Sequence, residues 1–213
     1  MIPPDFVRAN TELIAPPLVP EICLYLAAES LPIWRKTEEE LGQMNVPPPY
    51  WAFAWAGGQA LARFLLDNPD QVAGRRVLDL GAGSGITSIA AMKAGATHAI
   101  ASDIDALALA AIALNAEANA VEVETTMADL LASAPDAPDV VLVGDLFYER
   151  ALAERVLAFV EAARQRGAEV LVGDPRRSYF PSDRFRQVAL YSVPVTRELE
   201  DAEIKRSAVW RLA

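Results

Sequence analysis

A glycine-rich loop flanked by two aspartates is the clearest sign of chemistry in this sequence of 213 residues. The segment Asp79–Gly85 reads DLGAGSG and lies between a short apolar run and a predicted helix, and Asp103 follows 20 residues after Gly83. Glycine lets the backbone turn sharply and approach a ligand closely, and a carboxylate ending the next strand can bind both hydroxyls of a ribose. The pattern predicts a ribose-containing ligand at Gly81, Gly83, Gly85 and Asp103.

The loop departs from the dinucleotide-binding pattern in ways that favour S-adenosylmethionine. Position 86 is isoleucine, so the glycines follow G-x-G-x-G rather than G-x-G-x-x-G. Asp79 places a negative charge beneath the loop, which disfavours a pyrophosphate but suits the cationic end of S-adenosylmethionine. The carboxylate of that molecule would face the positive N-terminus of the following helix. A nicotinamide cofactor and a tight turn without any ligand are the alternatives.

A second loop, Gly144–Glu149, follows a buried predicted strand. Because the carboxyl ends of parallel strands share one edge of the sheet, this loop should face the glycine-rich loop. Methyl transfer from a sulfonium needs a neutral nucleophile held close to the methyl group. Asp145 can orient a lysine amine and take up its proton, directly or through water, and Phe147 and Tyr148 can wall the channel, since aromatic faces attract an ammonium by ~0.5–2 kcal/mol. The alternative is a turn with Tyr148 packed into the core.

Several other groups are assigned to packing or to the surface. Trp51 and Phe53 are expected to pack against the sheet edge. His98 is the only histidine and Cys23 the only cysteine, so we expect no metal site and no Cys–His nucleophile. The pair Arg176-Arg177 is expected to form a solvated turn rather than to contact an acidic patch.

The elements that must position the two loops alternate between strand and helix after residue 74. The strands are predicted at 77–80, 98–103, 121–127, 140–143 and 170–172, and the helices at 86–94, 106–119 and 149–166. Such alternation is typical of a parallel sheet with helices on both faces. The last two strands, 185–195 and 207–212, have no helix between them and predict an antiparallel hairpin. Asp129 follows the third strand, where its side chain would border an adenine; an ordinary turn aspartate, with Leu130 touching the ring, is the alternative.

Residues 1–50 are expected to form an N-terminal extension that packs on the core, and residues 51–213 the S-adenosylmethionine-binding domain. The extension is predicted to be irregular, with a strand at 22–26 and a helix at 34–41. Three prolines at 47–49 mark the boundary, and an amphipathic helix is predicted from Trp55 to Leu66.

The composition narrows the class of partner. With 19 basic and 29 acidic residues the formal net charge is −10, which disfavours nucleic acid and favours a basic protein segment or a small cation. A hydrophobic fraction of 53% excludes disorder. The longest uncharged run contains three prolines, and the first residues lack a signal or transit peptide, so we expect no membrane association and a cytoplasmic monomer.

The glycine-rich loop resembles that of the class I, seven-stranded methyltransferases, which have a Rossmann-like α/β fold. The sequence DLFY at Asp145–Tyr148 is similar to the D-x-x-[FY] signature of their protein-lysine branch. The segments 48–61, 173–181 and 198–210 resemble the electron transfer flavoprotein β-subunit lysine methyltransferases.

That resemblance implies transfer of methyl groups from S-adenosylmethionine to lysines of the electron transfer flavoprotein β subunit. By position, it places Trp55, the glycine loop, Asp103 and Gly144 at the cofactor and Asp145 at the substrate lysine. Relatives have a tryptophan after the third strand, where this chain has Asp129-Leu130. Mitochondrial members carry an import sequence, and its absence here is expected of a bacterial cytoplasmic protein.

Three other functions stay open at the level of sequence. Asp103-Ile104-Asp105 and Asn115-Ala116 are features shared with ribosomal-protein methyltransferases. A small-molecule amine methyltransferase would require a deep, closed pocket. A non-enzymatic scaffold would bind no cofactor, and the intact glycine loop and Asp145 argue against it.

Overall fold

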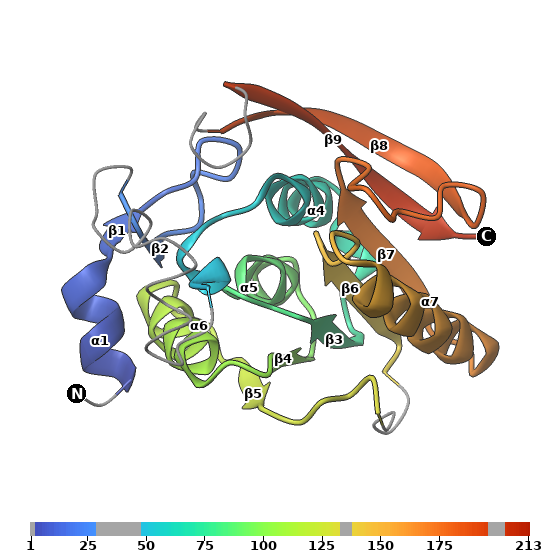
Figure 1. Ribbon diagram of the computed structural model, residues 1–213. Coiled ribbons are helices and arrows are strands. Elements are labelled where there is room, and N and C mark those ends of the chain that lie inside the picture. Colours follow the sequence, from blue (N-terminus) through green and yellow to red (C-terminus); the bar gives the residue numbers. More distant parts are fainter. Residues whose placement is uncertain (1–2, 29–47, 133–137, 196–202) are drawn as a thin grey trace.

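A seven-stranded sheet forms the centre of the computed structural model, which describes residues 3–28, 48–132, 138–195 and 203–213 (Figure 1). Its strands are β3 (Arg76–Leu80), β4 (His98–Ser102), β5 (Glu124–Thr126), β6 (Val140–Gly144), β7 (Glu169–Asp174), β8 (Phe185–Pro194) and β9 (Ile204–Leu212). In the order β5-β4-β3-β6-β7-β9-β8, the first five strands are parallel and the last two are antiparallel. The predicted mostly parallel sheet with an antiparallel C-terminal hairpin is confirmed.

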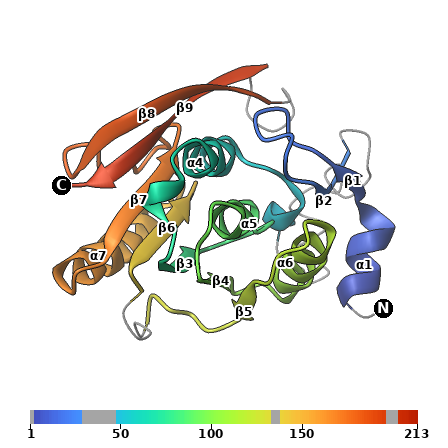
Figure 2. The same ribbon diagram turned by 180° about the vertical axis from the view of Figure 1, so that it is seen from behind.

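Helices cover both faces of this sheet, as Figures 1 and 2 show from opposite sides. They are α4 (Ala56–Asp67), α5 (Ile86–Lys93), α6 (Ala106–Ala118) and α7 (Arg150–Gln165), each within one residue of its predicted bounds. Successive side chains of a strand point to opposite faces. Val140 and Leu142 of β6 therefore pack with α4 and α5, whereas Val141 and Val143 pack with α7. This burial on both faces explains why β6 is apolar at every position.

The N-terminal segment is more regular than predicted. It forms α1 (Pro3–Asn10), β1 (Glu12–Ile14) and β2 (Leu24–Leu26), and β1 and β2 pair antiparallel. The expectation of irregular chain is wrong for α1, because proline is tolerated in the first turn of a helix, where the N–H groups have no partner within the helix. Val7 of α1 is fully buried in a cluster with α6 residues. The helix predicted at 34–41 lies outside the described residues.

The strands β3, β4, β5, β6 and β7 end along one edge of the sheet. The glycine loop follows β3, Asp103 follows β4, Asp145 follows β6 and the turn at 175–177 follows β7. Strand β5 is shorter than predicted because only Glu124–Thr126 pairs with β4. Within the described residues, no helix combines the length and the apolar character that a bilayer crossing requires.

Candidate active site

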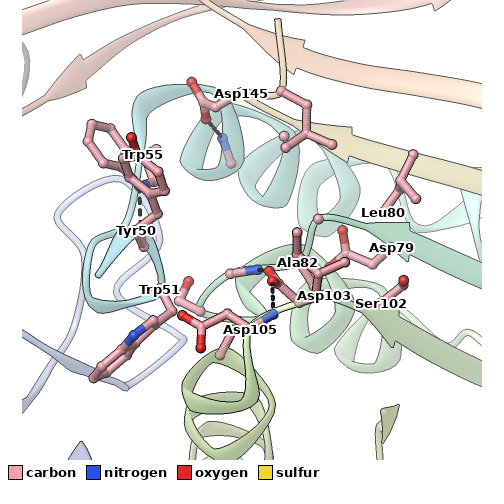
Figure 3. A pocket seen from close by; sticks show the side chains of 18 of the residues that line it. Tyr50, Trp51, Trp55, Asp79, Leu80, Ala82, Ser102, Asp103, Asp105 and Asp145 are labelled. Atoms are coloured by element: carbon pink, nitrogen blue, oxygen red, sulfur yellow. Dashed lines mark hydrogen bonds between the residues drawn. The ribbon is translucent and has the colours of Figure 1, made fainter. Parts of the chain in front are cut away.

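A cavity of about 490 Å³ opens at this edge of the sheet (Figure 3). Its walls come from the loops after β3, β4, β5 and β6, from the 3-10 turn η1 (Tyr50–Ala52) and from Trp55. The volume is within the range of small-molecule sites. The predicted cofactor positions that line it are Trp55, Asp79, Gly81, Gly83, Asp103, Asp129 and Gly144.

The three glycines of the loop are required by its backbone. Gly81, Gly83 and Gly85 have φ of 63°, 53° and 77°, a left-handed conformation that side chains disfavour. Gly85 does not line the cavity; it starts α5, and a Cβ there would press against Ile112 of α6. The buried amide of Asn115 donates to the carbonyl oxygen of Ser84 at 2.8 Å and so ties the loop to α6.

Asp103 joins the end of β4 to the glycine loop. Its Oδ2 accepts from the N–H of Gly83 at 2.9 Å and its Oδ1 from the N–H of Asp105 at 3.0 Å, as Figure 3 shows. Burial raises the pKa of the Asp103 carboxyl, and the backbone hydrogen bonds oppose that shift. A carboxylate oxygen has room for more than one donor, so both oxygens can also accept from a ligand in the cavity.

Asp79 lines the cavity beneath the glycine loop and is held by the start of α5. Its Oδ2 accepts from Thr87 Oγ1 at 2.5 Å, Ser88 Oγ at 2.5 Å and the N–H of Ser88 at 3.0 Å, all in the first turn of α5. Burial raises the pKa of this carboxyl. Since Asp79 already occupies the N–H of Ser88, that donor is not available to a ligand carboxylate.

Asp129 and Leu130, in the loop after β5, both line the cavity. Asp129 forms an ion pair with Arg155 of α7, with 2.6 Å between Oδ2 and Nη2, and Leu130 is buried. The structure therefore brings both candidates for an adenine contact to the same wall.

Asp145 is buried beside the first turn of α4. Its Oδ2 accepts from the N–H of Gly58 at 2.8 Å, and its own N–H donates to the carbonyl oxygen of Gly173 at 3.0 Å. The residue has a φ of 60°, which aspartate tolerates better than most non-glycine residues. Gly57 lets this contact form, because a Cβ there would lie 2.6 Å from Asp145 Oδ2.

Arg177 belongs to this site, so its assignment to a solvated turn is wrong. Its Nε and Nη2 lie 2.9 and 2.6 Å from Oδ1 of Asp145, and its guanidinium carbon lies 5.4 Å from the ring centroid of Trp55. Its side chain is 17% exposed, whereas Arg176 is exposed and lies over the ring of Trp210. The signal that could have found Arg177 is its place just after β7, whose carboxyl end lies at the same edge.

Asp174 lies behind Arg177 and is fully buried. Its Oδ1 accepts from the N–H of Arg177 at 2.7 Å, and its Oδ2 has no hydrogen-bond partner. Burial, and then the charge of Asp145, raise the pKa of Asp174 to about 7. A buried, unpaired carboxyl oxygen next to a second carboxylate favours the protonated form.

The aromatic residues divide between the cavity and the core. Tyr148 is 43% exposed, lines the cavity and lies 5.7 Å from the ring of Tyr50, which the sequence did not single out. Trp55 donates from Nε1 to the carbonyl oxygen of Tyr50 at 2.9 Å. The prediction that Phe147 walls the channel is wrong, because its side chain is fully buried on the α7 face, with the ring of Phe180 at 5.3 Å.

Trp51 and Phe53 are buried, as predicted, but they pack against α6 rather than against the sheet edge, and each also reaches the cavity wall.

The charge of the cavity suits a cation. Its lining holds five aspartates and two arginines, so acidic groups outnumber basic ones there. Burial raises the pKa of the Asp79, Asp103 and Asp105 carboxyls. His98 lies away from it, with Nε2 at 2.9 Å from Glu124. Among the described residues, no cluster of three or more His, Cys, Asp or Glu side chains has the arrangement of a metal site.

The sequence is similar over nearly its whole length to proteins of one kind. The electron transfer flavoprotein beta subunit lysine methyltransferase of Danio rerio is 38% identical over 97% of this chain and 82% of its own length. The Homo sapiens protein of the same name is 37% identical over 96% of this chain and 80% of its own length.

Two broader comparisons agree with the fold. Residues 60–166 match the family model described as ribosomal protein L11 methyltransferase (PrmA). Magnesium protoporphyrin IX methyltransferase from Synechocystis PCC 6803, solved with bound S-adenosylmethionine, aligns with a TM-score of 0.53, at 16% identity over 73% of this chain and 78% of its own.

Proposed function

The chain belongs to the electron transfer flavoprotein beta subunit lysine methyltransferases, and on this basis we propose that it transfers methyl groups from S-adenosylmethionine to lysine side chains of an electron transfer flavoprotein β subunit. The observation that carries the proposal is the placement of Asp103 and Asp145 in one cavity. Figure 3 shows them on opposite sides of it, one beside the glycine loop and the other beside α4.

The cofactor end of the cavity fits S-adenosylmethionine. Asp103 has acceptors for the ribose hydroxyls, the glycine loop gives close access to the backbone, and the acidic lining tolerates a sulfonium. Trp55, Gly144 and Asp129 would complete this end. When bound, the cofactor supplies a methyl group whose bond to sulfur breaks, with its electron pair going to sulfur, as the amine nitrogen bonds to carbon.

The substrate end of the cavity is formed by Asp145, Tyr148 and Tyr50. Asp145 orients the lysine amine by accepting a hydrogen bond from it, and the proton of the incoming ammonium leaves through water. Tyr148 and Tyr50 lie at the mouth and present aromatic surface to the lysine side chain. These roles concern position and electrostatics, which is what the protein must add to a reactive methyl donor.

The test is to incubate purified electron transfer flavoprotein with the enzyme and S-adenosylmethionine carrying a labelled methyl group. Mass spectrometry of the tryptic peptides should find the label on lysines of the β subunit, and the Asp145→Asn variant should leave them nearly unlabelled. Absence of label from every lysine of the β subunit would overturn the proposal.

A second candidate substrate is ribosomal protein L11, because the PrmA family model matches residues 60–166. That match stops before the turn that carries Arg177, whereas the flavoprotein-methylating relatives align over nearly the whole chain. Parallel incubations with ribosomal protein L11 and with free lysine test the alternatives. Label on ribosomal protein L11 would support that substrate, and label on free lysine would support a small-molecule amine methyltransferase. The cytoplasmic location and the monomeric state stay predictions.

A further inference from the structure

We infer that Arg177 is a positioning residue for methyl transfer: its guanidinium balances the charge of Asp145, so that this carboxylate accepts a hydrogen bond from the substrate amine without stabilising the ammonium. The inference rests on the proposed function, since it assigns a further residue to the same site. It follows from the contacts of Arg177 and from the charge that the nucleophile must have.

The donors around Asp145 divide between its two oxygens. Two guanidinium nitrogens of Arg177 donate to Oδ1, and the N–H of Gly58 donates to Oδ2. Each carboxylate oxygen can accept more than one hydrogen bond, so Asp145 can accept from an amine in addition to these donors. The Asp145 side chain is 8% exposed, and a pair this buried is screened little by solvent or salt.

A carboxylate alone would oppose the reaction that it is meant to assist. Lysine enters as an ammonium, which has no lone pair, and must lose a proton to water before its nitrogen can attack. An unbalanced negative charge within about 4–6 Å raises the pKa of an amine by roughly 1–3 units, and a positive charge lowers it. Arg177 supplies that positive charge next to Asp145, so the amine can deprotonate at lower pH while Asp145 still orients it.

The fold holds Arg177 firmly in this place. Asp174 accepts from its N–H at 2.7 Å, the Nε1–H of Trp210 in turn donates to the carbonyl oxygen of Asp174 at 3.0 Å, and Trp55 lies under the guanidinium at 5.4 Å. These three contacts restrict Arg177 to one orientation, unlike an arginine that extends freely into solvent. The turn after β7 therefore orients one charged group towards Asp145.

Two titratable groups act directly on this pair: Asp174 at the end of β7 faces Asp145 and Arg177, and Tyr148 in the loop after β6 faces Arg177. Tyr50 of η1, Glu149 and Asp103 face Tyr148 in turn. The first turn of α4 has no acidic residue. Burial raises the pKa of Tyr148, while Arg177 lowers it. Asp174 has a pKa of about 7, so its titration must be separated from that of the substrate amine.

The experiment measures kcat for flavoprotein methylation between pH 6.5 and 10 for the wild type, Arg177→Met, Arg177→Lys and the neighbouring control Arg176→Met. Arg177→Met should lose at least about tenfold in kcat at pH 7.5, with the midpoint of its pH profile raised by about one unit or more. Arg177→Lys should keep the wild-type midpoint, and Arg176→Met should behave as wild type. The same upward shift is expected in an Asp174→Asn background.

A merely structural role would lower kcat equally at every pH or weaken cofactor binding. An Arg177→Met profile with the wild-type midpoint, whatever its height, would overturn the inference. If thermal unfolding shows that Arg177→Met is not folded, Arg177→Gln takes its place, with the same expected shift in the midpoint of the pH profile.

A measurement without methyl donor separates this inference from the proposed function. n-Butylamine carries the alkylammonium end of lysine, and its binding can be followed by NMR titration at pH 7.5. Arg177→Met should bind it at least about tenfold more tightly than the wild type, because Asp145 has then lost the opposing positive charge of Arg177. Equal or weaker binding contradicts the role of Arg177, whereas a wild-type enzyme that labels no flavoprotein contradicts only the proposed function.

Discussion

The backbone N–H of Gly58 donates to Oδ2 of Asp145 at 2.8 Å, across 87 residues of sequence. The contact joins the first turn of α4 to the loop after β6, and it places a carboxylate at the positive end of a helix. It also joins two segments that carried the family resemblance independently, the block at 48–61 and the DLFY sequence.

Asp145→Asn should lower kcat by about 100-fold or more while leaving the Kd of S-adenosylmethionine within about threefold, since Asp145 lies at the substrate end. Single-turnover methylation and calorimetry measure the two quantities. Glu149→Gln, in the same loop but exposed, is the matched control and should keep wild-type activity. Normal turnover in Asp145→Asn would remove the assigned role.

Gly57→Ala should destabilise the protein by ~1–3 kcal/mol or more, because the new Cβ would overlap the carbonyl oxygen of Gly173 and crowd Asp145. Gly58→Ala is the comparison, since its Cβ would meet Cγ2 of Ile86 at 3.3 Å and Oδ2 of Asp145 at 4.0 Å, far less close than at Gly57, and alanine favours a helix. In urea denaturation, Gly57→Ala should have a clearly lower midpoint than Gly58→Ala. Equal midpoints would mean that α4 and β7 are packed less closely than described.

Asp103→Asn should raise the Kd of S-adenosylmethionine at least about tenfold, through weaker hydrogen bonds to the ribose. Asparagine keeps one acceptor oxygen for the two backbone N–H groups of Gly83 and Asp105, so the melting temperature should also fall, and binding is measured well below it. Calorimetry decides the matter, and an unchanged Kd would count against a ribose contact at this position.

Phe147→Ala and Tyr148→Ala should show that Phe147 stabilises the core whereas Tyr148 contributes to the substrate channel. Phe147 is fully buried, and its truncation should cost ~3–5 kcal/mol of unfolding free energy, with Phe147→Leu as a milder variant. Tyr148 is partly exposed at the cavity mouth, so Tyr148→Ala should fold stably and raise the KM for the flavoprotein. The opposite pattern, with Tyr148→Ala unstable and Phe147→Ala raising KM, would reverse the assignment.

Asp174 should make the stability depend on pH near neutrality. Its pKa of about 7 lies above the ordinary 3.8, so folding binds a proton between these values. The free energy of unfolding therefore falls as pH rises, by up to about 1.4 kcal/mol per unit until the carboxyl is ionised near pH 7. Asp174→Asn should remove this contribution. Urea denaturation at pH 5, 6, 7 and 8 should show the difference between wild type and variant changing up to pH 7 and levelling above it; a constant difference would contradict the shift.

Much of the fold could be read from the sequence because local patterns fix it. The sequence pattern placed four helices within one residue of their bounds, and β6 is apolar at every position since both of its faces are covered. The glycine-rich loop was also predictable from local sequence, since each of its three glycines has a positive φ that other residues disfavour. Helix α1 was missed because its stability comes from the burial of Val7 against α6, a contact that no local pattern records.

The site itself depended on tertiary structure wherever a side chain had two possible directions. Phe147 and Tyr148 are adjacent in sequence, yet the loop sends one ring into the core and the other to the cavity. Arg177 follows an exposed arginine and reads as part of a solvated turn until β6 and β7 are set side by side, which brings its guanidinium to Asp145. The residue types and the edge where they gather are properties of the sequence, whereas their partners exist only once parallel strands bring their carboxyl ends together.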